Sequence, residues 1–440
     1  MSQLKVLIVG ASIAGPTAAY WFAKAGANVT VIERFPKLRI NGQSIDIRTA
    51  GVTVMRKMPG MEAAVRAKTT QIEGMSFVNN NGRSCGTIRA TGDPDQQSIV
   101  SEYEIFRGDL ARILFDLTKY NENINYVFGE QIASIQQNEK DDGSVTVEFA
   151  NGLPTSAYDL VVACDGAASR TRAIGFGCGV RDHIKSTNAW TAYFSIEQDL
   201  LEGSKVGQAY SAAGGRTVFV GPDPSGVTRV GLMAALPRDD RDATLPFREA
   251  SKQGDDVLKQ HVAQHYKGIG WKTDEAVKGM MEAGDFYAGE IVQVKTPSLY
   301  KGRVVLVGDA GYAPGPTGTG TSLAIAGAYV LAGEVGKHRG DLAAGLRGYE
   351  AQMRPIIDDM QKIPPFVLDL FAPQTAWAIW LRNNIFAIIA RSRILELAQK
   401  LFGFFGSAFA SSDKYRLPDY EWVAEDHASN RSPSTMRPSR

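Results

Sequence analysis

Short apolar runs, with helically spaced segments between them, dominate the first part of the chain. One run covers residues 5–9, a second covers 28–33, and residues 14–25 between them have helical spacing. Buried parallel strands read as short continuous apolar runs, and a strand, a helix and a strand close together form one βαβ unit. The pattern therefore predicts an α/β fold built on a parallel sheet.

The pattern changes in the middle of the chain. Between residues 186 and 296, alternating segments are separated by Gly, Pro and Asp turns, which is typical of an antiparallel sheet. A buried strand at 303–307 and a helix at 321–335 then resume the first pattern. The other predicted elements are a helix at 109–120, strands at 145–149 and 160–163, and alternating strands at 190–196, 217–221, 228–233 and 291–295.

This order predicts a Rossmann-like first domain, interrupted by an antiparallel-sheet domain and followed by C-terminal helices. We expect the first domain to comprise residues 1–185 and 297–360, and the inserted sheet domain to comprise 186–296. Residues 361–424 are predicted to form a helical extension. Residues 425–440 are polar and contain Pro433 and Pro438, so a disordered tail is predicted there.

The composition is that of an ordinary globular chain of 440 residues, 44% hydrophobic and 22% charged, with a net charge of +1. A nucleic-acid-binding protein would normally carry a basic excess, so no nucleic-acid partner is expected. The three cysteines form no disulfide framework, and no CxxC or His-rich pair indicates a metal site. These features favour a reducing compartment, and we expect a cytoplasmic protein without a metal ion. The 45 glycines, about a tenth of the chain, exceed the usual ≈ 7%.

The C-terminal part is more apolar than the rest. Charged residues such as Arg382, Arg391 and Lys400 interrupt it, so that no stretch of 18 residues lacks a charge or a break. A membrane span requires such a stretch. Packed helices are therefore the favoured interpretation, and contact with one face of a membrane is the alternative.

The first motif with chemical content lies between the first predicted strand and helix. It reads Gly10-Ala11-Ser12-Ile13-Ala14-Gly15, which is G-x-G-x-x-G with serine at the second glycine. Such a turn lets backbone N–H groups and a helix N-terminus face a pyrophosphate. Glu33 ends the second strand, where a carboxylate accepts hydrogen bonds from an adenosine ribose. A dinucleotide site is predicted here, and a glycine turn that serves only helix packing is the alternative.

Two further motifs place an aspartate after a predicted strand. Asp165 follows the strand at 160–163, and a common turn is the alternative to a functional role. Asp309 follows the strand at 303–307 and leads through a glycine-rich loop to Gly320 and a helix. An acid in this place suits a polyol chain and a polar ring, and the positive end of the helix could stabilise negative charge on that ring.

These three motifs, in this order and spacing, resemble those of FAD-dependent monooxygenases of the p-hydroxybenzoate hydroxylase type. The resemblance covers roughly residues 4–360 and is strongest to the branch that includes tetracycline-inactivating monooxygenases and fungal secondary-metabolite hydroxylases. The runs shared with that branch are Arg39-Ile40-Asn41-Gly42-Gln43-Ser44-Ile45-Asp46-Ile47 and Phe106-Arg107-Gly108-Asp109-Leu110. Two departures are Ser12 and a slightly shorter loop at 311–320, with threonine where glutamine or methionine is common.

The resemblance implies an FAD-binding first domain, a substrate-binding sheet domain, and roles at matching positions. Glu33 would hold the FAD ribose and Asp309 the ribityl chain. Arg107 and Asp46 would contact FAD, and Arg39 matches a position associated with NADPH. Asp165 and Arg172 belong to a motif linked to both nucleotides. The predicted cofactor-binding residues are Gly10, Ser12, Ile13, Ala14, Gly15, Glu33, Arg34, Arg39, Asp46, Arg48, Arg107, Asp165, Asp309 and Gly320.

Several of these residues also have a structural interpretation. Arg39 and Arg48 could be solvated surface charges. Asp46 could be a turn-former, and Arg107 could belong to a structural ion pair rather than to a phosphate site.

Three residues are candidates to line a substrate site. Tyr193 lies in an alternating strand, and the resemblance places its sheet over the flavin ring; Gln208 and Tyr210 are the other two. Packing within the sheet is favoured for both tyrosines. Because the composition and the C-terminal part are apolar, a hydrophobic small-molecule substrate is expected.

The resemblance also implies a reaction. NAD(P)H would reduce FAD, oxygen would form a C4a-hydroperoxide, and one oxygen atom would hydroxylate or epoxidise an aromatic, polyketide or terpenoid-like substrate. The cofactor carries this chemistry, so we assign no catalytic protein residue. The alternatives are an FAD-dependent dehydrogenase, reductase or cyclase on the same fold, and a flavin-binding scaffold without activity.

Overall fold

The first sheet contains the predicted βαβ unit. Its strands are β1 (Lys5–Val9), β2 (Asn28–Glu33), β7 (Ile124–Phe128), β11 (Leu160–Ala163), β17 (Tyr300–Lys301) and β18 (Val304–Leu306). In the computed structural model their order is β17-β18-β11-β1-β2-β7, and all neighbours are parallel except β17 and β18. The chain thus leaves this sheet after β11 and rejoins it at β17. The structure describes residues 3–39, 42–95, 97–98, 100–137, 143–240, 242–363, 367–391 and 414–423.

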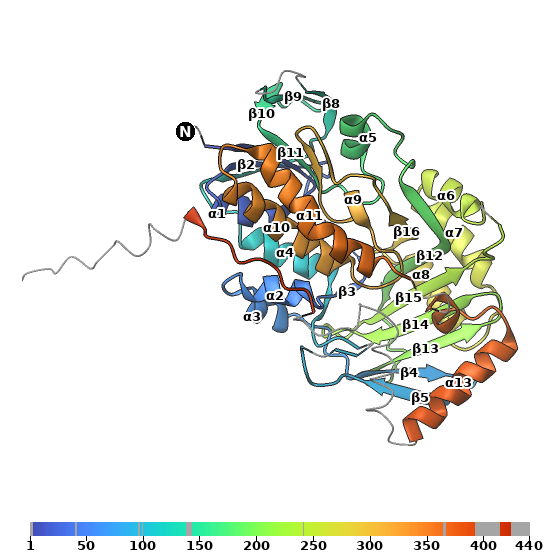
Figure 1. Cartoon of the computed structure of the whole chain (residues 1–440). Coiled ribbons are helices and arrows are strands. Elements are labelled where there is room, and N and C mark those ends of the chain that lie inside the picture. The colour runs from blue at the N-terminus through green and yellow to red at the C-terminus, as the bar shows by residue number, and fades with distance from the viewer. Residues whose placement is uncertain are drawn as a thin grey trace, which may run out of the picture.

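Strand β1 is the centre of this sheet and is buried on both faces. Val6 and Ile8 pack against α1 (Ala14–Lys24) and α10 (Gly320–Lys337), with α11 (Leu342–Met360) outside them (Figure 1). On the other face, Leu7 and Val9 pack against a small sheet of β8 (Ile132–Gln137), β9 (Val145–Phe149) and β10 (Ser156–Tyr158). Cover on both faces explains why β1 is apolar at consecutive positions.

Shorter elements connect the first sheet to the rest of the molecule. They are β3 (Ser44–Asp46), α2 (Ala50–Arg56), α3 (Met61–Arg66), β6 (Glu104–Phe106), α4 (Arg107–Asp116), α5 (Arg170–Phe176) and α9 (Asp309–Tyr312). Strands β3 and β6 form a separate antiparallel pair.

The second sheet combines the middle of the chain with an earlier hairpin. Its strands are β4 (Gly74–Val78), β5 (Ser84–Arg89), β12 (Ile184–Ile196), β13 (Val206–Ala212), β14 (Arg216–Pro222), β15 (Thr228–Ala235) and β16 (Tyr287–Val294). Their order is β16-β12-β15-β14-β13-β4-β5, and only β13 and β4 pair in parallel. The predicted strands lie within this sheet or the first one, except the strand at 145–149, which is β9 of the small sheet. The β4–β5 hairpin was not predicted, and it comes from the range expected to belong to the first domain.

Helices cover one face of the second sheet. They are α6 (Leu245–Lys252), α7 (Asp255–Tyr266) and α8 (Thr273–Glu282), none of which the alternating pattern indicated. Trp190, Phe194 and Tyr210 point into this helical layer. Because successive strand residues point to opposite faces, Tyr193 points to the other side of the sheet.

The C-terminal helices α12 (Val367–Phe371) and α13 (Ala376–Arg391) cover part of that other side. Helix α13 lies along β5 (Figure 1), whereas Leu368 of α12 packs against Ala189 of β12 and Met233 of β15. Phe386 stacks on Phe77 with ring centroids 4.7 Å apart. The buried Arg382 donates to Ser211 Oγ at 2.9 Å. No helix in the described part of the chain is long and apolar enough to span a bilayer.

Residues 414–423 return to the first fold as a non-helical strap. The Tyr420 hydroxyl donates to Glu334 on α10 at 2.9 Å, and Trp422 packs on Trp21 of α1 with centroids 4.8 Å apart. This part of the predicted helical extension is therefore not helical. The predicted disordered tail at 425–440 lies outside the described residues.

Candidate active site

The glycine turn between β1 and α1 brings two strands and a helix into backbone contact. A Cβ atom on Gly15 would lie 1.8 Å from the carbonyl oxygen of Gly10, and one on Gly10 would lie 2.6 Å from the carbonyl oxygen of Cys164. Gly10 also has a φ of +106°, which residues with a side chain rarely adopt. Both glycines are thus required by packing, and the same absence of side chains leaves the backbone open to a ligand.

The start of α1 fits the pyrophosphate of FAD. Ser12 precedes the N-cap residue Ile13, no side chain caps the helix, and the first turn from Ala14 onward contains no acidic residue. The first N–H groups of a helix lack intrahelical acceptors, and the helix dipole adds positive potential there. Phosphate oxygens would supply the missing acceptors.

Glu33 lies beside this turn, at the end of β2. Its carboxylate accepts hydrogen bonds from the N–H of Ala11 at 2.9 Å and from the N–H of Phe35 at 3.1 Å. These two bonds fix the carboxylate and leave other lone pairs for a ribose hydroxyl. The neighbouring Arg34 is exposed, and its guanidinium lies 4.8 Å from the centre of the Phe35 ring.

Asp309 lies just after the carboxyl end of β18. Its side chain is exposed to water, yet burial by surrounding protein raises the pKa of its carboxyl, while the charge of Arg107 lowers it. We refer to the space beside this carboxylate as the proposed flavin hollow. A Cβ on Gly320 would lie 3.6 Å from Asp309 Oδ1, and α10, which Gly320 begins, has neither a side-chain cap nor an acid in its first turn. An acid, a guanidinium and a positive helix end therefore meet where a ribityl chain and flavin ring would fit.

Asp165 and Arg172 hold the scaffold behind this hollow. Asp165 accepts a hydrogen bond from the N–H of Thr171 at 3.0 Å, in the first turn of α5. Arg172 is fully buried and donates to the carbonyl oxygen of Ala310 at 2.6 Å. Arg172 thus ties the two aspartate motifs together from inside the protein.

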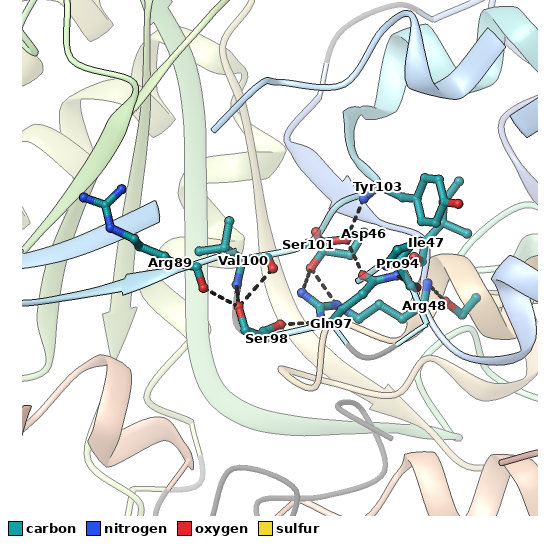
Figure 2. A network of polar contacts seen from close by, with 11 residues as sticks. Asp46, Ile47, Arg48, Arg89, Pro94, Gln97, Ser98, Val100, Ser101 and Tyr103 are labelled. Atoms are coloured by element: carbon teal, nitrogen blue, oxygen red, sulfur yellow. Dashed lines mark hydrogen bonds and ion pairs between the residues drawn. The ribbon is translucent and has the colours of Figure 1, made fainter. Parts of the chain in front are cut away.

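Asp46 and Arg48 bind each other within a polar network (Figure 2). The Arg48 side chain donates to Asp46 Oδ2 at 3.0 Å and 3.1 Å, and to the carbonyl oxygen of Ser98 at 2.6 Å. Gln97 donates to the carbonyl oxygen of Ile47 at 3.0 Å. Arg48 is 3% exposed, so its interpretation as a solvated surface charge is wrong. The network holds the segment before β6 against β3. It thereby also positions Arg107, which directly follows β6.

Glu104 adds an unpredicted acid to this network. It lies directly opposite Asp46 in the β3–β6 pair. Burial and the charge of Asp46 raise the pKa of Glu104 above its usual range, whereas a hydrogen bond with Ser44 lowers it. Arg48 binds the Asp46 carboxylate directly, and the neighbouring charge of Asp46 favours retention of a proton on Glu104.

Arginines gather where the two sheets meet. The Arg39 guanidinium lies 5.1 Å from the ring of Phe35 in the first fold and 5.4 Å from the ring of Tyr287 on β16. Burial and the charges of Arg107 and Arg34 lower the pKa of Arg39. Arg39 therefore bridges the two parts of the molecule, and the group of guanidiniums provides positive potential for a phosphorylated ligand.

The three candidate substrate residues do not share one surface. Tyr193 pairs with Tyr287 across β12 and β16, is only partly exposed, and has its pKa raised by burial. The Tyr210 hydroxyl instead donates to the carbonyl oxygen of Ile269 at 2.7 Å, within the layer of α6–α8. Gln208 is two residues from Tyr210 on the same strand and shares that face. Of the three, Tyr193 is the residue on the side that faces away from the helices.

Sequence reasoning missed several residues at this joint. Tyr287 and Gln293 belong to β16, whose first half has no alternating pattern and was not predicted as strand. Arg229 of β15 lies over the ring of Phe106, with the guanidinium 4.2 Å from its centre, just before Arg107. No local signal identifies such residues, because their partners are distant in sequence. The described residues include no group of three or more side chains suited to a metal ion.

Comparison with known proteins agrees with this geometry. Residues 3–362 match the family model described as FAD binding domain. The chain belongs to this family. It is 32% identical over 431 residues to monooxygenase CTB7 of Cercospora beticola, covering 97% of this chain and 99% of that protein. It is 33% identical over 419 residues to the FAD-dependent monooxygenase asL4 of Sarocladium schorii, covering 90% of this chain and 94% of that protein.

Solved structures share the fold of this chain. The tetracycline destructase Tet(51) superposes with a TM-score of 0.72 at 26% identity, covering 95% of this chain and 100% of that chain. HpxO of Klebsiella pneumoniae, in complex with FAD and uric acid, superposes with a TM-score of 0.68 at 21% identity, covering 92% and 97%. The predicted α/β fold, the family resemblance, the monooxygenase class and the cofactor FAD are confirmed.

Proposed function

We propose that this FAD-dependent monooxygenase consumes NAD(P)H and O2 and inserts one oxygen atom into a hydrophobic organic substrate. In the balanced reaction, substrate, O2, NAD(P)H and one proton give the hydroxylated product, water and NAD(P)+; an alkene would give an epoxide instead. Bound FAD supplies the redox chemistry. The route of oxygen transfer inferred from the resemblance stays a prediction.

The groups around Asp309 support this proposal for the cofactor half of the site. Asp309 would hold the ribityl hydroxyls, and Arg107 and the start of α10 would favour negative charge on the ring. The turn from Gly10 to Gly15 and Glu33 would hold the other end of the dinucleotide.

The position of Tyr193 is the observation that carries the substrate half. Its side chain leaves the second sheet on the side without α6–α8, next to Tyr287, over which Arg39 lies. Gly231 lies opposite on β15, where a Cβ would be 3.2 Å from the Tyr193 ring. A flat organic molecule would bind between this surface and the flavin, where the neighbouring side chains would exclude water.

The test is oxygen insertion by the purified FAD-loaded protein. A panel of aromatic, polyketide and terpenoid compounds is scored for stimulated NAD(P)H oxidation against release of hydrogen peroxide. With isotopically labelled O2, we expect one labelled atom in the product. Conversion of a substrate under strict anaerobiosis without NAD(P)H would instead support a dehydrogenase, reductase or cyclase, and would contradict the proposal.

A further inference from the structure

Two buried glutamines donate hydrogen bonds to the loop between α9 and α10, on the side away from the proposed flavin hollow. Gln293 Nε2 donates to the carbonyl oxygen of Pro314 at 3.1 Å and to that of Gln361 at 2.7 Å. Gln361 Nε2 donates to the carbonyl oxygen of Ala313 at 3.1 Å and to that of Val294 at 2.8 Å. Each amide nitrogen has two N–H donors, and each is matched to two carbonyl oxygens. We call Gln293 and Gln361 the glutamine clamp.

Both glutamines of the clamp are buried, and a backbone hydrogen bond supports their contacts with the loop. Gln293 is 8% exposed and Gln361 is 6% exposed. The N–H of Val294 donates to the carbonyl oxygen of Ala313 at 3.0 Å, alongside the amide of Gln361. A buried carbonyl that loses its donor is costly, so these bonds hold the loop in one position.

The far side of the same loop faces the proposed flavin hollow. A Cβ on Gly320 would lie 3.6 Å from Pro314 Cδ and equally close to Asp309 Oδ1. The described chain contains no cis peptide bond, so the N–H of Gly315 points away from the carbonyl of Pro314 that Gln293 holds. The clamp therefore holds the Pro314 carbonyl on the side away from the proposed flavin hollow. The N–H of Gly315, in the same trans peptide, points to the hollow side.

Gly315 shows how closely the loop packs against the Gln293 side chain. Its φ of +82° favours glycine, and a Cβ there would lie 3.0 Å from Gln293 Cγ. The loop approaches the Gln293 side chain as closely as a residue without a side chain allows. A shift of Gln293 would thus move the loop directly.

The two glutamines come from different parts of the chain. Gln293 lies near the end of β16, in the second sheet, and Gln361 is the C-cap of α11 in the first fold. The second sheet therefore contributes to the flavin-facing loop through Gln293, on the same strand as Tyr287 near the proposed substrate surface.

We propose that the glutamine clamp positions the loop from Ala313 to Gly320 against the flavin, so that FAD binding depends on a strand of the second sheet. Neither glutamine touches the cofactor in this proposal; both act through the carbonyl oxygens of Ala313 and Pro314. The proposal rests on FAD as cofactor and does not depend on the substrate or on NAD(P)H.

The test compares Gln293→Met and Gln361→Met with the control Gln374→Met. Gln374 is exposed, but it donates to the carbonyl oxygen of Ala235 at 2.8 Å, so the control also loses a glutamine-to-carbonyl bond, away from the loop. We measure the FAD dissociation constant by fluorescence, the visible absorption spectrum of bound flavin, and the thermal stability of the FAD-free protein. Each clamp variant is expected to weaken FAD binding about tenfold, because the loop loses a side-chain hydrogen bond to one of its buried carbonyls, and to shift the flavin spectrum.

The control is expected to lose thermal stability without a change in FAD affinity or flavin spectrum. If the clamp variants behave like the control, the glutamines are only structural and the proposal is overturned. Should either methionine variant fail to fold, Gln293→Asn, which keeps an amide but shortens its reach, is measured in its place. Wild-type FAD affinity and spectrum in that variant would equally contradict the proposal.

Discussion

The two sheets of this protein meet a ligand in opposite ways. The first sheet presents the ends of its parallel strands, where Gly10 follows β1, Glu33 ends β2 and Asp309 comes shortly after β18. The second sheet presents a face, from which Tyr193 and Tyr287 project. At strand ends the backbone itself approaches the ligand, whereas on a sheet face side chains do so.

This difference determines how much each region tolerates change. The cofactor turn is built from backbone atoms in contact, so a single added carbon atom would clash. The face around Tyr193 is lined by side chains, which can be exchanged without moving the strands. We infer that the first sheet fixes the cofactor and that the second can vary with the substrate.

The largest effect that would test this comparison is expected for Gly15→Ala. Its Cβ would lie 1.8 Å from the Gly10 carbonyl oxygen, so the helix and strand must separate. We expect a loss of about 3 kcal/mol or more in the free energy of unfolding, together with loss of bound FAD. Urea unfolding and the flavin content of the purified protein are the measurements.

The matched control for that variant is Gly221→Ala in β14. A Cβ at Gly221 would meet no atom within 4 Å, and its φ is not in the positive range. Its unfolding free energy is expected to stay within about 0.5 kcal/mol of wild type. Equal losses in both variants would show that the first sheet is no more constrained than the second.

Asp309→Ala is expected to have an intermediate effect, confined to the cofactor. The ribityl hydroxyls would lose a charged acceptor, which costs about 1–3 kcal/mol of FAD binding energy. Titration of the FAD-free protein with FAD measures it, with Asp255→Ala on the exposed first turn of α7 as control. Retention of wild-type FAD affinity in Asp309→Ala would remove this residue from the site.

The contrast between the two sheets also explains which parts of the fold could be predicted from sequence. Strands β1, β2 and β11 end where their apolar runs end, because a strand covered on both faces needs only apolar residues. The β4–β5 hairpin was missed because its place depends on parallel pairing with β13, more than a hundred residues later. Helices α6–α8 were missed because turn residues in that region were read as breaks between strands.

For single side chains of the site, too, prediction from sequence fails where the position depends on residues distant in the chain. Glu33 and Asp309 lie at the carboxyl ends of their strands as the apolar runs indicated, because the end of a strand limits where the next residues can lie. Their cofactor roles stay predictions. Arg48 and Arg172 were not predicted to point inward, because their partners are the carbonyl oxygens of Ser98 and Ala310, which any residue could provide. Tyr193 and Tyr210 lie on different strands, and their opposite faces follow only from the register between strands.

The smallest predicted effect is a loss of folding stability at low pH. It arises in the helices that cover the second sheet. Burial, together with the charges of Arg216 and His261, lowers the pKa of His265 on α7 to about 4. The unfolded chain takes up a proton at its usual pKa of about 6.5, whereas the folded protein does not. Folding stability therefore falls as pH decreases from about 6.5 towards about 4, by about 1 kcal/mol at pH 5 after allowance for solvent screening.

Replacement of this imidazole would separate its contribution from that of the carboxylates. His265→Gln is expected to flatten the pH dependence of urea unfolding between pH 7 and pH 5, while Gln264→Ala, on the same helix but without a titrating group, leaves it unchanged. The fluorescence of Trp190 provides a local signal of unfolding, since its ring centre is 5.2 Å from that of His265. If the slope persisted in His265→Gln, the acid sensitivity would have to come from groups elsewhere, and the second sheet would not differ from the first in this respect.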